Sequence, residues 1–447
     1  INPATGKPGA MWYGVTKANG RTALQESKYN NWLPRLGFAY LFNSKTTIRG
    51  GFGVYTYPWN VDTYASNGLG NAFTSSGNLT DSTNNVYPVV ILSSDGNTNY
   101  QGSKGASINS LFKRAPLTPE AYNGQSVGFQ QYDSPVPRLY SWNLTVQREL
   151  AWSLVGELSY VGNYQNNLPF PTDLNQPPED KLGPNSAQFR PYPFQTISGP
   201  TTQGNANYNA LQASVTQRMR HGLTFNFNYT WSHMLSNQDS SGRGTMMGVQ
   251  VFQRAHEPDK NYGNSNFDVR HAFKGYAVYE LPFGRGRAYL NQNAIADKVV
   301  GGWRLSGTLV WQTGSPFTPV MATNNSYSLS TNASWYPNVV GNPKLDNPTI
   351  NSWFNVNAFA APTPGTFGNM GRNIVFGPGM FNMGLSLAKS FTLREGLMFD
   401  LSANATNALN HPSFGQPDRQ IGPGHIGKIT SVRGGPRQIE LVGKLRF

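Results

Sequence analysis

The feature that most constrains the fold is a strict alternation of side-chain type between Leu223 and Trp231. Apolar Leu223, Phe225, Phe227, Tyr229 and Trp231 alternate with Thr224, Asn226, Asn228 and Thr230. A period of two indicates a β-strand with one apolar and one polar face. Residues 211–218 alternate in the same way, and only Arg220-His221-Gly222 separates the two segments. Together they predict an antiparallel hairpin.

The same hairpin unit recurs along the chain. Further strands are expected at residues 36–42, 46–55, 140–149, 154–162, 267–281, 303–312, 381–391, 397–406 and 437–447. Most have the length of about 9 to 11 residues that a tilted strand needs to cross a bilayer. Long Gly/Ser/Asn/Pro-rich connections are expected at residues 58–137, 163–206, 235–266, 313–380 and 409–436. The alternation of short and long connections predicts an all-β, antiparallel transmembrane outer-membrane barrel wall, with short periplasmic turns and long extracellular loops.

The expected number of strands, about eleven, is odd. Bacterial single-chain barrels are generally even-stranded and closed, because an open edge in lipid leaves backbone groups unpaired. The pattern therefore predicts roughly half of a 22-stranded barrel, with exposed edges at residues 33–42 and 437–447. We expect that this chain alone does not form a closed pore.

Composition excludes several other classes of protein. The chain has no cysteine, so disulfide frameworks and cysteine-based metal or redox sites are excluded. No run of about eighteen apolar residues exists, which excludes a helical membrane protein. The net charge is +13, but the Lys and Arg residues are scattered singly, so no nucleic-acid partner is expected.

Several short segments match motifs of catalytic, phosphate-binding or metal sites, but the sequence around each one does not support that function. Gly124–Gly128 has the spelling of a nucleophile elbow but lies in a polar loop, and Gly422–Lys428 resembles a phosphate loop but lacks the following Ser or Thr. His256 and Glu257 have no second histidine four residues on. A carbohydrate-active enzyme would need paired carboxylates on facing strands, which the scattered acidic residues do not suggest. We therefore expect no catalytic residue, no metal and no cofactor.

Several segments carry a resemblance to a known family. Tyr140–Leu150 (YSWNLTVQREL) followed by Gly156–Gly162 (GELSYVG) resembles a hairpin of the Oar-like TonB-dependent receptors of Acidobacteria-type bacteria. Other segments similar to that family follow in the same order, at residues 268–273, 279–287, 301–307, 314–317, 407–414 and 436–447. The resemblance covers most of the chain from about Leu33 onward.

The resemblance implies a location in the bacterial outer membrane, contact with its lipid, and assembly by the barrel-assembly machinery. It implies that residues 1–33 are the remnant of an extracellular loop and 34–447 the C-terminal portion of the barrel. The plug domain, through which such receptors contact TonB, and the N-terminal domains are expected to be missing from this chain. Phe447 ends an alternating strand and is expected to serve as the assembly signal, although Gly443 lies one residue off the usual pattern.

Two functions remain open from the sequence. The first is a receptor that captures a small-molecule, sugar or peptide ligand and admits it to the periplasm; the second is a structural or adhesive surface protein. Loops 58–137 and 313–380 contain aromatics expected to contact ligand, namely Tyr100, Phe112, Tyr122, Tyr327, Trp335, Tyr336 and Trp353. Arg218, Arg270 and Lys274 are expected to face the lumen and to favour anionic solutes. The alternative is that the loops only pack on each other.

Overall fold

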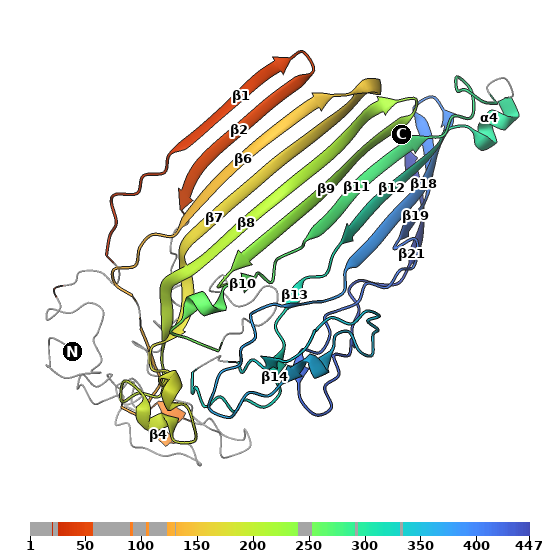
Figure 1. Ribbon diagram of the computed structural model, residues 1–447. Helices are drawn as coiled ribbons and strands as arrows, with labels where there is room; N and C mark the ends of the chain where they lie inside the picture. Colours follow the sequence, from red (N-terminus) through yellow and green to blue (C-terminus); the bar gives the residue numbers. More distant parts are fainter. Residues whose placement is uncertain are drawn as a thin grey trace.

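The main element of the computed structural model is one curved antiparallel sheet in which eleven long strands follow chain order (Figure 1). The structure describes residues 20, 26–56, 90–92, 104–106, 123–129, 131–239, 253–290, 294–330 and 334–447. The long strands are β1 (Arg35–Asn43), β2 (Thr46–Thr56), β6 (Arg138–Glu149), β7 (Leu154–Asp173), β8 (Ile197–Arg220), β9 (Leu223–Ser236), β11 (His271–Glu280), β12 (Trp303–Gln312), β18 (Met380–Arg394), β19 (Leu397–Thr406) and β21 (Gln438–Arg446).

Shorter elements lie mainly in the connections. β5 (Val127–Gly128) pairs with β8, and β10 (Gly263–Asn264) pairs with β9. The separate pairs are β3 (Val90–Leu92) with β4 (Lys104–Ala106), β13 (Pro316–Phe317) with β17 (Val375–Phe376), β14 (Val320–Met321) with β20 (Gln420–Ile421), and β15 (Asn338–Val339) with β16 (Phe359–Ala360). Helical turns occupy residues 151–153, 179–181, 186–189, 258–261 and 356–358, and α4 spans Ala294–Val300. In the described part of the chain, no helix is long and apolar enough to cross a membrane.

The sequence prediction of an antiparallel sheet with eleven strands is confirmed. The tight turn between β8 and β9 places His221 at φ 49° and Gly222 at φ 78°, and Gly396 between β18 and β19 lies at φ 74°. Glycine reaches such positive φ values without a steric penalty, which explains its place in both turns.

Two connections differ from the prediction. Residues 163–206 were expected to be a loop, but β7 and β8 continue into them and pair as far as Asp173 with Ser198. The extension lies at the long-loop end, where strands need no apolar face toward lipid, so its sequence lacks the alternation that would reveal it. Its register shifts at Leu168, which also interrupts any regular pattern. The other difference is α4, which lies in the connection between β11 and β12.

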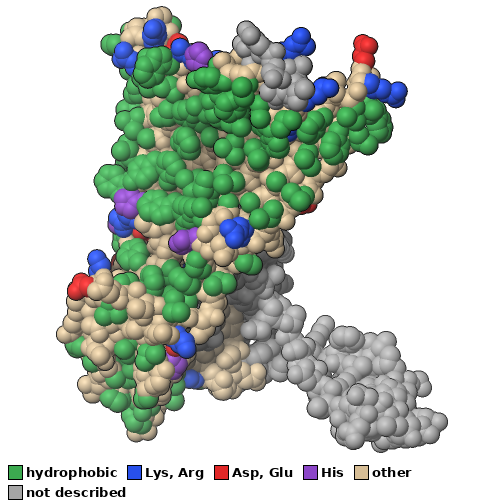
Figure 2. All heavy atoms as spheres, turned by 90° about the vertical axis from the view of Figure 1, so that its right-hand side faces the viewer, with side chains coloured by type: hydrophobic (Ala, Val, Ile, Leu, Met, Phe, Trp, Pro, Cys, Tyr) green, Lys and Arg blue, Asp and Glu red, His purple; other side chains and the backbone are tan. Residues whose placement is uncertain are grey.

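The sheet has one apolar and one polar face. Residues paired directly across antiparallel strands share a face. Phe227 pairs with Val215 and Gly275, and Leu305 pairs with Leu387 and Tyr279. Figure 2 shows the result as a broad band of hydrophobic side chains over the strands, with charged side chains mainly beyond its two ends.

Polar contacts join strands across the opposite face of the sheet. Arg49 pairs with Glu157 at 2.9 Å, and Thr145 and Ser159 share a hydrogen bond of 2.9 Å. Further cross-strand contacts on this face join Asn226 with Thr216, Ser386 with Asn404, Ser390 with Asp400, and Arg446 with Asp400. The predicted division of the β9 side chains into the two sets is therefore seen in the pairing.

Among the described residues, both ends of the sheet are open. β1 pairs only with β2, β21 pairs only with β19, and every residue of both strands is exposed. An open edge presents a row of unpaired backbone N–H and C=O groups. The predicted edges at residues 33–42 and 437–447 are therefore present.

We predict opposite responses to charge at two adjacent residues in the middle of β18. Leu385 lies on the apolar face and Ser386 on the polar face, where Ser386 donates to Asn404. In the assembled full-length protein, Leu385→Arg should lower the free energy of unfolding by about 2–4 kcal/mol, because a charge then faces the middle of the bilayer. Ser386→Arg should cost less than about 1.5 kcal/mol, the contribution of its hydrogen bond. Denaturant unfolding from bilayers measures both, and equal losses would contradict the assignment of faces.

Candidate ligand-binding site at the long-loop end of the sheet

The connections from β12 to β18 and from β19 to β21 fold together at the long-loop end of the sheet. We call the described residues of 313–379 and 407–437 the loop cap. Its core is built from Phe317, Val320, Tyr336, Phe354, Ala358, Phe359, Met370, Val375 and Ile421. Phe354 is 1 % exposed, and its ring meets Phe317 and Phe359 edge-on with centroids 5.6 and 6.0 Å apart. The loop cap is thus a packed unit.

Two of the seven aromatics predicted to contact ligand are buried in this unit. Trp335 and Tyr336 are each 2 % exposed, and the indole of Trp335 donates to the Thr366 carbonyl at 2.8 Å. Burial raises the pKa of Tyr336, against the opposing charges of Arg372, Arg419 and Arg254. Neighbouring loops, and not strand alternation, supply the core that buries these two side chains, and their contact with ligand stays a prediction.

Two further predicted aromatics, Trp353 and Tyr327, are only partly buried. Trp353 packs against the core of the loop cap and donates its indole N–H to the Phe376 carbonyl at 2.9 Å. Tyr327 lies at φ 55°, in the left-handed region that a tyrosine rarely adopts. Both keep exposed surface and remain predicted ligand contacts. The predicted contacts Tyr100, Phe112 and Tyr122 lie outside the described residues.

A buried ion pair attaches the loop cap to the sheet. The Arg372 guanidinium lies 2.8 Å from the Asp239 carboxylate, and both side chains are 3 % exposed. Arg372 also donates to the backbone carbonyl and the hydroxyl of Ser236, the last residue of β9. Asp239 accepts from Ser236, Ser265 and the backbone N–H of Asn266. Burial excludes the water that could replace a lost partner of either charge. These contacts should therefore hold the loop cap and the end of β9 together.

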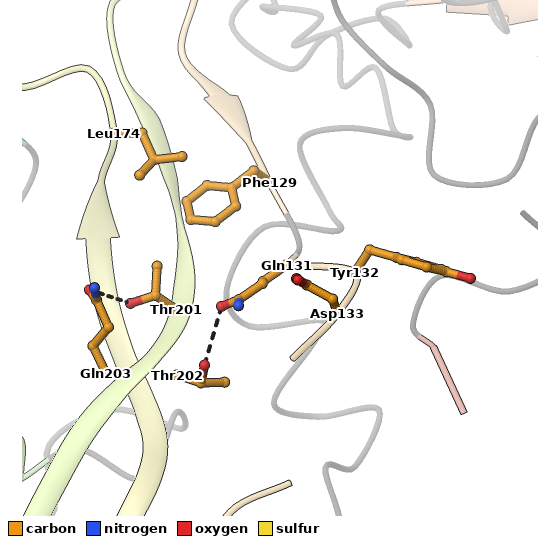
Figure 3. Close-up of a pocket in the computed structure, with 8 residues that line it drawn as sticks. All are labelled: Phe129, Gln131, Tyr132, Asp133, Leu174, Thr201, Thr202 and Gln203. Carbon is orange, nitrogen blue, oxygen red and sulfur yellow. Dashed lines mark hydrogen bonds between the residues drawn. The ribbon is translucent and has the colours of Figure 1, made fainter. Parts of the chain in front are cut away.

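A hollow of about 610 Å³ opens beside the extended ends of β7 and β8 (Figure 3). It is lined by Phe129, Gln131, Tyr132, Asp133, Leu174, Thr201, Thr202 and Gln203. Its volume lies within the range of about 300–1,000 Å³ typical of ligand sites. Figure 3 shows Gln131 and Thr202 pointing toward each other, with Thr202 donating to Gln131 at 3.4 Å, while Thr201 donates to Gln203 of the same strand at 3.2 Å.

The base of this hollow is held by a small core and a close backbone contact. Val127, Phe194 and Ile197 form the core, with Phe129 and Leu174 packed against it. A Cβ atom on Gly199 would lie 2.3 Å from the Phe129 carbonyl, so the two chains can approach only because residue 199 is glycine. Phe129 and Leu174 therefore give the hollow an apolar floor, while its walls offer hydroxyl, amide and carboxylate groups.

A second, smaller hollow of about 300 Å³ adjoins the first. Asp133 lines both, and the smaller one adds Lys28, Arg138 and the amides of Asn30, Asn31, Asn166 and Asn167. The residues that line the two hollows could not be identified from the sequence, because hydroxyl and amide side chains in loops show no periodic pattern. Among the described residues, no cluster of three His, Cys, Asp or Glu side chains could hold a metal ion.

A model of the family described as "Outer membrane beta barrel domain" matches residues 1–440. The chain belongs to this family. Its localisation is accordingly the bacterial outer membrane, and the apolar face of the barrel domain contacts lipid.

The fold of this outer-membrane barrel domain is similar to three solved structures at low identity. The transporter YddB from Escherichia coli is 11 % identical, with 90 % of this chain and 39 % of that one covered and a TM-score of 0.42. The ferripyoverdine receptor of Pseudomonas aeruginosa is 10 % identical, with 93 % and 32 % covered and a TM-score of 0.40. The FrpB iron transporter from Neisseria meningitidis is 10 % identical, with 93 % and 39 % covered and a TM-score of 0.39. This chain thus spans under two fifths of each structure. No curated protein matches it.

The three basic residues predicted to face the lumen of the barrel domain are not gathered at one site. Lys274 pairs with Asn228 on the polar face, whereas Arg270 lies just before β11 and ion-pairs with Asp268 at 3.2 Å. Arg218 precedes the turn to β9, at the opposite end of the sheet. The preference of these three residues for anionic solutes stays a prediction. The charge of Arg270 is already paired with that of Asp268.

Phe447 keeps the position that an assembly signal would need. It is 98 % exposed and follows β21, whose Leu445 pairs with Phe399 on the apolar face. Its recognition by the barrel-assembly machinery stays a prediction.

We predict that Arg372→Ala releases the loop cap from the sheet. Removing one partner of a buried ion pair costs about 3–5 kcal/mol, since Asp239 would stay buried without its counter-charge. Hydrogen exchange of the assembled protein should then show loss of protection in the loop cap, with strands β1 to β9 unchanged. Lys344→Gln, at an exposed residue of the same cap, is the control. Unaltered protection in Arg372→Ala would show that this ion pair does not hold the cap.

A second prediction concerns alkaline pH. The ordinary pKa of tyrosine is about 10, and burial raises that of Tyr336. The folded loop cap therefore holds this proton more tightly than the unfolded chain. Its contribution to stability should be complete below pH 10 and should be lost as the pH rises beyond the unfolded value. Near-ultraviolet circular dichroism should show alkaline loss of cap packing that Tyr336→Phe reduces. Tyr289→Phe, at an exposed tyrosine, should leave it unchanged, and equal alkaline sensitivity in all three proteins would refute the assignment.

Proposed function

We propose that this chain forms part of the wall and the mouth of an outer-membrane receptor that captures a polar solute and admits it to the periplasm. The observation that carries this proposal is the hollow between residues 129 and 131–133 and the ends of β7 and β8, at the long-loop end. Receptors bind ligand with few, well-placed polar groups above an apolar floor. The solved structures to which this fold is similar include outer-membrane transporters and a receptor with ferripyoverdine bound. Their ligands are not carried over to this chain.

The chemistry of the hollow favours a ligand rich in hydroxyl groups. Its lining offers Thr201, Thr202, Gln131 and Gln203 as donors and acceptors, with a single charged group at Asp133. A negative group in the site disfavours anionic solutes, while amides and hydroxyls match the alternating donors and acceptors of a sugar. We therefore propose a neutral oligosaccharide or a similar polyhydroxylated molecule within the predicted range of small-molecule, sugar or peptide ligands.

The remaining parts of the receptor are also proposed. The open edges at β1 and β21 require neighbouring strands in lipid, so we propose that further strands complete the barrel. In this arrangement residues 1–33 belong to an extracellular loop and 34–447 to the C-terminal portion of the barrel. A plug domain outside this chain would fill the lumen and contact TonB. Such a receptor performs no chemistry on its ligand.

The test uses cells that express the full-length protein and fluorescent neutral oligosaccharides as probes. Asp133→Asn combined with Gln203→Ala should lower probe binding about tenfold, since each lost hydrogen bond contributes about 0.5–1.5 kcal/mol. Asp346→Asn, at an exposed aspartate of the loop cap, is the matched control. Unchanged binding in the double variant would remove the hollow as the capture site.

The same assay separates transport from adhesion. In a transporter, dissipating the proton-motive force should abolish accumulation of the probe inside the cell and leave surface binding intact. A structural or adhesive protein would bind the probe at the surface without accumulation in either condition. Binding without energy-dependent accumulation would therefore favour the adhesive alternative.

A further inference from the structure

The connection between β11 and β12 stands out at the short-turn end of the sheet. β1 and β2, β8 and β9, and β18 and β19 are each joined by two residues, whereas residues 281–302 separate β11 from β12 and include α4. Figure 1 shows α4 projecting beyond the ends of the strands. The structure describes residues 281–290 and 294–302 of this connection.

The end of α4 is fixed to the lipid-facing side of the barrel. Trp303 and Lys389 are direct partners on β12 and β18, on the face that also holds Leu305 and Leu387. The Trp303 indole donates to the Val299 carbonyl at 2.9 Å, and the Lys389 ammonium donates to the carbonyls of residues 298 and 299 at 2.6 and 3.0 Å. Residues 298–300 therefore lie over the outer surface and not over the lumen.

Lys389 explains how this attachment is stabilised. A charge on the lipid face of a barrel is costly unless it is paired or reaches the interface. Lys389 is 4 % exposed, its ammonium lies 5.6 Å from the Trp303 ring and 4.9 Å from the Phe391 ring, and the carbonyls at the end of a helix are acceptors without partners in the helix. Lys389 thus donates hydrogen bonds to carbonyls at the end of α4 and fixes the position of the connection between β11 and β12.

The surface that this connection presents combines apolar and basic side chains. Phe283, Tyr289, Leu290 and Val299 are 36–64 % exposed, with the Phe283 and Tyr289 rings 6.0 Å apart. Arg285 and Lys298 are exposed beside them, and neither forms an ion pair within the described residues. Asp297, the acidic residue of this connection, accepts a hydrogen bond from the backbone N–H of Arg285 at 2.6 Å and is therefore directed toward the connection itself. Figure 2 shows Lys and Arg side chains along the corresponding rim, above the hydrophobic band.

We propose that residues 281–290 and 294–302 form an interfacial anchor that docks on the periplasmic leaflet of the outer membrane and binds the phosphates of anionic phospholipids. The continuity of its apolar side chains with the lipid-facing surface places it at the headgroup level. Aromatic and aliphatic side chains enter the boundary region of the leaflet, while Arg285 and Lys298 meet the negative headgroups. The anchor is independent of the ligand that the receptor captures.

The test measures the depth of a nitroxide on Val299→Cys in the full-length protein in nanodiscs. This chain contains no cysteine, and Val299 is 64 % exposed, so the label should not disturb packing. We expect the label to collide more often with oxygen than with a water-soluble nickel chelate, as at a bilayer interface. A label on Glu395→Cys, in the turn between β18 and β19, should show the aqueous pattern. Equal aqueous exposure of both labels would overturn the proposal.

The role of charge is tested by titrating phosphatidylglycerol into phosphatidylcholine nanodiscs. Docking of the Val299 label should strengthen with the anionic lipid, and Arg285→Gln and Lys298→Gln should each weaken its apparent affinity about fivefold. Lys344→Gln, at the opposite end of the molecule, should have no effect. Lys389→Met should release the label to water, while Lys389→Arg should retain docking. Docking that ignores lipid charge and both Gln variants would overturn anionic recognition.

Discussion

Hydrogen bonding of the backbone in lipid is the constraint on which the rest of this structure depends. No water in the bilayer core can satisfy a free N–H or C=O group, and each unsatisfied group costs several kcal/mol. Neighbouring strands meet this constraint for every long strand except along the outer edges of β1 and β21. Once the backbone is paired, the side chains of each strand must divide between lipid and lumen, which produces the alternation seen at residues 223–231.

The two ends of the sheet are stabilised by different physical means. At the long-loop end, where water is available, the loop cap has its own aromatic core around Phe354 and is joined to β9 through Arg372 and Asp239. The extensions of β7 and β8 support the hollow at Thr201 without any apolar face toward lipid. At the short-turn end, connections of two to four residues leave little surface, whereas the connection between β11 and β12 is much longer. The proposed capture site and the proposed anchor are thus separated by the length of the strands.

The transmembrane strands could be predicted from the sequence, because lipid and water impose a period of two on side chains such as Phe225 and Asn226. The predicted bounds of residues 303–312 and 397–406 coincide with β12 and β19. Outside the bilayer, a strand does not have to divide its side chains between lipid and water. Residues 163–206 therefore show no periodic signal for the extended hairpin. The burial of Trp335 and Tyr336 could not be predicted either, since their partners, such as Gln253 and Thr366, are brought together only by tertiary folding.

The central claim is that these eleven strands are part of a larger barrel and do not close on themselves. Disulfide formation between engineered cysteines in the assembled full-length protein tests it most directly. Ser402 and Val442 are direct partners on β19 and β21, so Ser402→Cys with Val442→Cys should cross-link readily. Ala39→Cys with Val442→Cys places one cysteine on each outer strand, β1 and β21. We predict no cross-link within a monomer for this second pair, and an efficient one would show that β1 and β21 pair and contradict the account.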